Sequence, residues 1–104
     1  MIQLHLDCKV DPAKEQEMLT YFANVFRPAA AKFPGFIDVK MLKLRGALAG
    51  KAPSNVNYRF WLAYESEELR QTWLKSDIHQ EVWGAMEKTL SSPDYDVLLF
   101  DVMK

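Results

Sequence analysis

The residues whose types and spacing suit chemistry fall in two stretches of the chain. In the N-terminal stretch, apolar and polar residues alternate, so His5 and Asp7 belong to one face of a predicted strand. A carboxylate beside an imidazole raises the pKa of the histidine and fixes its tautomer, which predicts a general base for neutral pH. The alternative is a polar pair whose two groups simply satisfy each other.

The second stretch, Thr72 to Met86, holds two of the three tryptophans and one of the two histidines. Helical spacing brings Trp73, His79 and Trp83 near one region of surface. With Trp61, these side chains predict an aromatic slot for a flat, polycyclic or quinone-like ligand, in which His79 donates a hydrogen bond to a substrate oxygen. For each tryptophan the alternative is core packing, and for His79 it is capping of the preceding turn.

Other site chemistry is limited. Asn24 and Arg59 are candidate polar contributors to substrate binding. No metal site is expected, because two histidines and one cysteine lack ligand spacing. No glycine-rich phosphate loop or Gly-x-Ser-x-Gly turn is present. Cys8 alternates with the apolar residues of its strand, so we expect it to be buried and inert.

Length and charge narrow the class of protein. The 104 residues predict one domain, spanning 1–104, and a net charge of −1 argues against nucleic acid as a partner. No apolar run is long enough to span a membrane, and the alternating N-terminus does not resemble a signal peptide. A single cysteine excludes an internal disulfide and suits a reducing compartment. We therefore expect a cytoplasmic protein.

The elements that must position these residues follow from periodicity and from breaker residues. Strands are predicted at 2–10, 36–45, 56–64 and 95–103, and helices at 12–32, 66–75 and 77–90. The first helix carries an apolar stripe and is expected to kink or break at Pro28. Its stripe consists of Met18, Phe22, Val25, Phe26, Ala29 and Phe33.

The order of these elements, β-α-β-β-α-β, predicts an α+β, ferredoxin-like fold with a four-stranded antiparallel sheet and its helices on one face. Several residues on the second face, such as Leu42 and Trp61, are also apolar. A sheet that is apolar on both faces, with helices for one, predicts a homodimer packed sheet against sheet.

Three short motifs resemble the antibiotic biosynthesis monooxygenase superfamily, whose members are dimeric α+β barrels. They are the Phe-Pro-Gly-Phe turn at 33–36, the WLAYESEEL stretch at 61–69 and the Ser-Asp-Ile-His run at 76–79. The resemblance spans essentially the whole chain. It implies a pocket between the second helical region and the first strand, and so predicts that His5 and Asp7 face the helices.

The segment from Trp73 to Asp77 is similar to one in the heme-degrading branch of this superfamily. In that branch a strand-one asparagine, a helix-two tryptophan and a later histidine ligand act together. The tryptophan matches Trp73, the asparagine falls at Asp7, and the ligand falls at Trp83, which cannot bind iron. Heme is therefore disfavoured as a cofactor.

The resemblance implies a monooxygenase that acts without metal or flavin on a small aromatic or quinol-type substrate. Asp7 or His5 is the expected base, His79 the expected donor, and Trp73 and Trp83 the expected walls. Two alternatives stay open: heme degradation with an altered iron ligand, and a non-catalytic dimeric binding or stress protein, or an isomerase, on the same scaffold.

Overall fold

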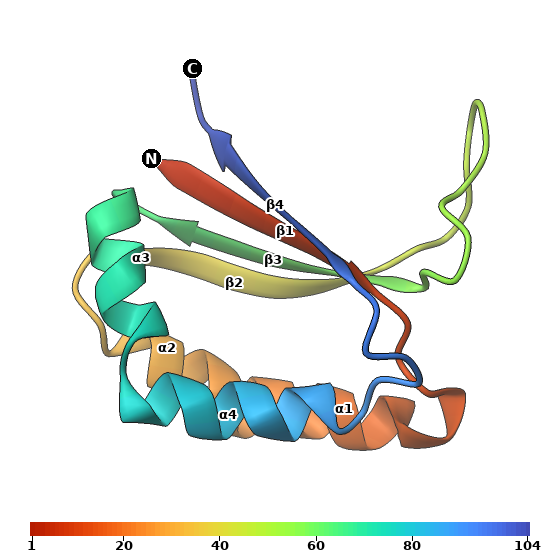
Figure 1. Ribbon diagram of the computed structural model, residues 1–104, viewed down its shortest axis with the longest axis horizontal. Helices are drawn as coiled ribbons and strands as arrows, with labels where there is room; N and C mark the ends of the chain where they lie inside the picture. Colours follow the sequence, from red (N-terminus) through yellow and green to blue (C-terminus); the bar gives the residue numbers. More distant parts are fainter.

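The computed structural model describes residues 1–104 and confirms the β-α-β-β-α-β order (Figure 1). The four strands form one antiparallel sheet in the order β2-β3-β1-β4. Their bounds are Ile2–Cys8 for β1, Phe36–Lys43 for β2, Tyr58–Tyr64 for β3 and Asp96–Asp101 for β4. The predicted α+β, ferredoxin-like class is confirmed.

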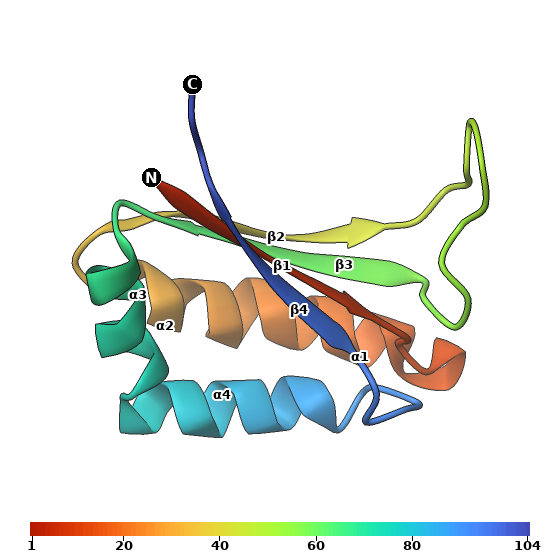
Figure 2. The ribbon, with the colours of Figure 1, turned by 45° about the horizontal axis from the view of Figure 1, so that its top comes forward.

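The helices lie on one side of this sheet, with α3 across one end of the layer (Figures 1 and 2). The first helical region contains η1 at Pro12–Lys14, α1 at Glu15–Tyr21, η2 at Phe22–Phe26 and α2 at Arg27–Ala31. The second contains α3 at Glu67–Leu74 and α4 at Asp77–Glu87. No helix is both long enough and apolar enough to cross a membrane.

The first helical region passes Pro28 without ending there. Its turn at Phe22–Phe26 is a π-helix, in which the amide of Arg27 donates to the carbonyl of Phe22. The wider turn accommodates a proline that lacks an amide hydrogen and would clash with the carbonyl of Asn24 in a regular α-helix.

The π-turn also changes which residues face the core. Met18, Phe22, Phe26 and Ala30 are buried, a spacing of four residues throughout. The prediction was therefore wrong for Val25, which is 41% exposed, because the wide turn rotates it outward.

Serine side chains position the second helical region. Ser66 Oγ accepts a hydrogen bond from the amide of Leu69, and Ser76 Oγ accepts one from the amide of His79. Both are helix N-caps, so the predicted break at residues 76–77 is confirmed. The break turns the chain between α3 and α4 and places His79 in the first turn of α4.

The side chains of β1 that face the helices are not those that the predicted site requires. Ile2, Leu6 and Cys8 are buried against the helix layer. Because side chains alternate along a strand, His5 and Asp7 point to the other face. Their predicted place on the helix-facing side is wrong, since the apolar half of the strand contributes to the core instead.

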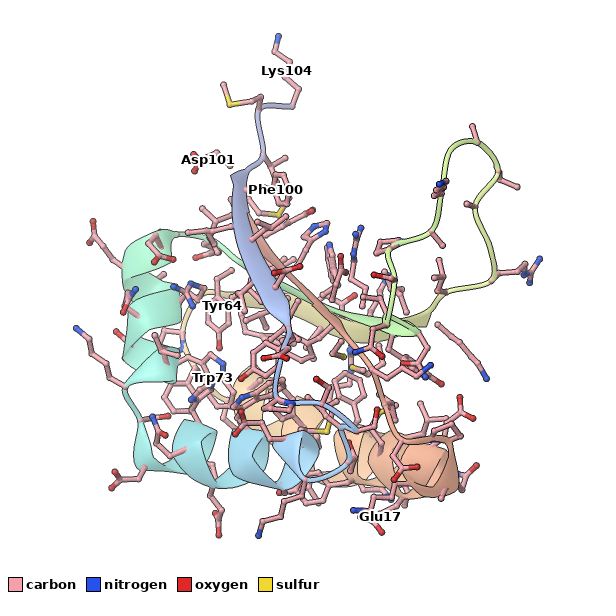
Figure 3. All side chains as sticks on the ribbon, turned by 45° about the vertical axis from the view of Figure 1, so that its right-hand side comes forward. Glu17, Tyr64, Trp73, Phe100, Asp101 and Lys104 are labelled. Carbon is pink, nitrogen blue, oxygen red and sulfur yellow. The ribbon has the colours of Figure 1, made fainter.

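No helix covers the second face of the sheet, which we call the open face. Register places Gln3, His5 and Asp7 there beside Phe100, Leu98 and Asp96 of β4. Leu98 and Phe100 are 52% and 46% exposed. Figure 3 shows Phe100 and Asp101 near the C-terminal end of β4, away from the helices.

Candidate functional site

The most enclosed cavity lies between the sheet and the second helical region and has a volume of about 320 Å³. Ten of its twelve lining residues are hydrophobic. Leu4 and Leu6 of β1 form its floor, and Trp73, His79 and Trp83 of α3 and α4 form a wall. Such a cavity is at the small end of ligand pockets and suits a molecule of roughly one to three rings.

The cavity is bounded by aromatic rings that contact one another, most of them edge to face. Trp73 is 1% exposed, and its ring lies 5.8 Å from Phe26 at 87°. Trp83 lies 5.6 Å from Phe60 and 6.0 Å from Tyr95. In Figure 3, Trp73 lies between the sheet and the helices. Edge-to-face contacts are a preferred arrangement of aromatic rings, so they favour these ring orientations in the wall.

His79 brings an imidazole to the lining of this cavity. Its Nδ1 is the only buried side-chain nitrogen or oxygen in the chain that lacks a hydrogen-bond partner. Its ring lies 5.0 Å from that of Trp73 at 85°. An unpaired buried polar atom costs free energy, and a ligand group that paired with this nitrogen would recover that cost.

The charge of His79 follows from its surroundings. Burial lowers the pKa of His79 below its ordinary value of 6.5, and the nearby cation of Arg70 lowers it further. The imidazole is therefore neutral near pH 7 and offers one acceptor nitrogen and one donor N–H.

Arg70 is the second polar residue of the cavity, and its position could have been predicted. Helical spacing puts it on the same face as Trp73 and Leu74, which also line the cavity. Its guanidinium Nε and Nη2 donate to Glu67 at 2.6 and 2.7 Å. The aromatic residues Phe26, Phe60 and Tyr95 were also absent from the predicted site, because they come from elements that only the fold brings together.

Four other predicted site residues come together on the open face, away from this cavity. Asp7 accepts hydrogen bonds from Arg59 at 2.7 and 3.1 Å, and the pair lines a separate cavity of about 250 Å³. His5 contacts Gln3 at 3.1 Å rather than Asp7. Trp61 lies under the ammonium of Lys40, 5.4 Å from the ring centroid.

The electrostatics of His5 also differ from the prediction. Burial and then the Arg59 cation lower the pKa of His5, and the opposing effect of Asp7 does not reverse this. The expected upward shift is wrong, because Asp7 forms an ion pair with Arg59 instead.

Asn24 is separate from both groups. It is exposed on the outer side of the first helical region, at a shallow depression shared with Gln16, Glu17 and Thr20. The predicted site residues therefore divide into three places, and only Trp73, His79 and Trp83 share the apolar cavity.

The residues present do not fit heme at the position that the resemblance indicates. Trp83, which stands at the ligand position, contributes an indole to the cavity wall, and an indole N–H is a donor with no lone pair for iron. No three His, Cys, Asp or Glu side chains come together as a metal site.

No protein-family model matches the sequence, and no curated protein matches it significantly. Solved structures do match. A candidate antibiotic biosynthesis monooxygenase from Caulobacter crescentus has 18% identity and a TM-score of 0.78, covering 99% of this chain and 90% of that one. A second candidate antibiotic biosynthesis monooxygenase, from Nitrosomonas europaea, has 10% identity and a TM-score of 0.75, with 100% of each chain covered.

A variant of SnoaB, a cofactor-independent oxygenase from Streptomyces nogalater, is also similar. Its identity is 16% and its TM-score 0.75, with 99% of this chain and 93% of that chain covered. The chain therefore has the fold found in antibiotic biosynthesis monooxygenase structures, as the sequence motifs predicted. At these identities the likeness establishes the fold and leaves the activity to the site.

Proposed function

We propose that the chain is a cofactor-independent monooxygenase that oxidises a small, flat aromatic or quinol-type substrate in the cavity between α3, α4 and the sheet. The observation that carries this proposal is the unpaired, buried Nδ1 of His79, a residue that lines an apolar cavity with aromatic walls. The fold shared with a cofactor-independent oxygenase supports it.

In the proposed reaction His79 acts as the base, in place of the expected Asp7 or His5. Its neutral imidazole takes a proton from a substrate carbon activated by an adjacent aromatic hydroxyl or carbonyl. The resulting carbanion-like form transfers electrons to O₂ and forms a carbon–oxygen bond. The O–O bond of the peroxide then breaks, so that a CH₂ group becomes a carbonyl and the second oxygen atom leaves as water.

This stoichiometry balances without an added reductant, because the substrate supplies both hydrogens and all four electrons. The remaining task of the protein is to hold the ring against Trp73 and Trp83 and to exclude water from the carbanion. Both tasks suit a cavity whose lining is mainly hydrophobic.

Oxygen uptake with a panel of hydroquinones, hydroxynaphthalenes and hydroxyanthrones tests the proposal. With an accepted substrate, we expect His79→Phe to lower kcat at least about 100-fold, the usual contribution of a general base. His5→Gln, which changes the histidine on the open face, is expected to retain most of the rate. Loss of rate in His5→Gln alone would move the chemistry to the open face.

Binding without oxygen uptake across the panel would instead favour the non-catalytic alternative. A hemin titration tests the heme-degradation alternative. That alternative requires a shifted Soret band at stoichiometric hemin, and the absence of a shift would exclude it.

We also propose that two copies pack through their open faces. The face carries exposed apolar side chains, including Leu98 and Phe100 of β4, as expected of a surface that a second copy covers.

A further inference from the structure

The polar end of the cavity has an unusual charge balance. Apart from the hydrophobic residues, only Arg70 and His79 line the cavity, and no acidic side chain does. The cavity therefore presents one cation and one neutral imidazole to whatever binds there.

Arg70 is held in a fixed orientation by its own helix. The residue is 9% exposed, and Glu67, three residues earlier, receives its Nε and Nη2 hydrogen bonds. Gln71 holds the same carboxylate through a 2.8 Å hydrogen bond to Oε2. The guanidinium is thus positioned before any ligand arrives, which lowers the entropy cost of using it.

One terminal nitrogen of this guanidinium is still free. Arg70 Nη1 donates to no group of the chain, while Nε and Nη2 are taken by Glu67. A guanidinium carries five N–H donors in a planar fork, so Nη1 can donate to an oxygen of a ligand without disturbing the Glu67 pair.

We infer that the cavity selects aromatic ligands that carry an anionic oxygen, a carboxylate or a phenolate, bound by Arg70 Nη1 near the Nδ1 side of His79. This inference rests on the proposed ligand-binding role of the cavity and adds the chemical class of the ligand. The rings lie along Trp73 and Trp83, and the anionic group lies at the α3 end of the cavity, where Arg70 is anchored.

The inference also gives Arg70 a role in the proposed reaction. It binds the oxygen on which negative charge collects when His79 removes the proton, so it acts as an electrostatic stabiliser rather than as a base. Glu67 is then a positioning residue that acts through Arg70.

Calorimetric titration with matched naphthalene ligands at neutral pH tests the inference on the full chain. The ligands at neutral pH are 2-naphthoate, its neutral carboxamide and the cationic 2-naphthylmethylammonium ion. 2-Naphthol is titrated separately, in buffers below and above its own pKa, the second of which is alkaline. We expect the carboxylate to bind at least about tenfold more tightly than the carboxamide, since a charge-assisted hydrogen bond exceeds a neutral one. The ammonium ion is expected to bind most weakly, and the naphtholate arm distinguishes phenolates from carboxylates.

Arg70→Gln is expected to abolish the preference for the carboxylate while the affinity for the carboxamide stays within about twofold. Lys75→Gln is the matched control, because Lys75 is an exposed cation at the end of the same helix and does not line the cavity. It should keep the preference. An equal loss in both variants would indicate a general charge effect and overturn the role of Arg70.

Circular dichroism checks whether Arg70→Gln folds. If it does not, the titrations of the wild type still test the inference. Equal affinities for carboxylate and carboxamide would overturn the anion preference and leave the proposed aromatic site intact. Binding of none of the ligands would overturn both.

Discussion

At the scale of single residues, His79 combines a cost in stability with a capacity for chemistry. Its unpaired Nδ1 is buried, and its pKa is lowered by burial and by Arg70. In the unfolded chain the same imidazole titrates near its ordinary pKa of 6.5. Below that pH the unfolded state binds more protons than the folded one, so stability falls as pH falls.

We therefore expect His79→Phe to unfold at the same temperature as the wild type or higher, because an apolar ring replaces an unsatisfied polar group. Its loss of stability between about pH 6.5 and pH 5 should also be smaller than in the wild type. His5→Phe serves as the comparison variant, because His5 is the other histidine whose pKa is lowered. Thermal denaturation across this pH range measures both, and a steeper loss in His79→Phe would contradict the assignment.

Cys8 shows the opposite case, a potentially reactive group made inert. Its thiol is 2% exposed, and burial, with the nearby Asp7 charge, raises its pKa to about 11. Near pH 8, roughly one thiol in a thousand is then ionised. We expect no reaction with Ellman's reagent in the folded protein and one thiol per chain after denaturation. Rapid labelling of the native protein would contradict the burial.

At the scale of elements, Gly35 controls how the first helical region meets β2. Its φ is +86°, and a Cβ there would lie 2.5 Å from Leu69 Cδ1 of α3. Gly84, within α4, has open space around its Cβ position. The two glycines thus form a matched pair, one required by backbone and packing and one not.

We expect Gly35→Ala to destabilise the protein by about 1–3 kcal/mol, through backbone strain and the contact with Leu69. Gly84→Ala should stabilise it by about 0.5–1 kcal/mol, because alanine is the better helix former. Urea denaturation of both variants against the wild type measures the difference. Similar effects of the two changes would contradict this account.

Most of the secondary-structure elements could be predicted from the sequence. Strand and helix order followed from periodicity, and the break at residues 76–77 followed from serine capping. The π-turn could not be derived, because it depends on how the chain relieves the clash at Pro28. Val25 was misplaced for that reason.

The site was predicted where it depended on one element and missed where it depended on several. Trp73, His79 and Trp83 share a broken helix, so spacing alone grouped them. The prediction for His5 and Asp7 is wrong because it follows the family resemblance, whereas the apolar alternation of β1 decides which face of the strand is buried. Burying Ile2 and Leu6 fixes that face regardless of function.

At the scale of the whole molecule, the open face is the surface most suited to assembly. Leu98 and Phe100 project from β4, and Leu42 is exposed on β2 across the same face. Leu48, in the loop between β2 and β3, is fully exposed but lies off the sheet. Figure 1 shows this loop extending past the end of the sheet.

We expect the wild type to have the mass of two 12.0 kDa chains in solution. Phe100→Asp should shift it to a monomer, because a charge buried in an apolar interface costs several kcal/mol. Leu48→Asp is the matched control and should stay dimeric. Light scattering coupled to size exclusion measures all three, and a monomeric wild type would end the proposal.

The unpaired nitrogen of His79 has a practical consequence for finding the natural ligand. A molecule that fills the cavity and pairs with that nitrogen binds the folded chain alone, so it raises the melting temperature by mass action. At a hundred times its dissociation constant the gain is about 2.7 kcal/mol. For a domain of this size that corresponds to an upward shift of roughly 10 °C or more. A thermal-shift screen of metabolite libraries can therefore identify the occupant before any reaction is known.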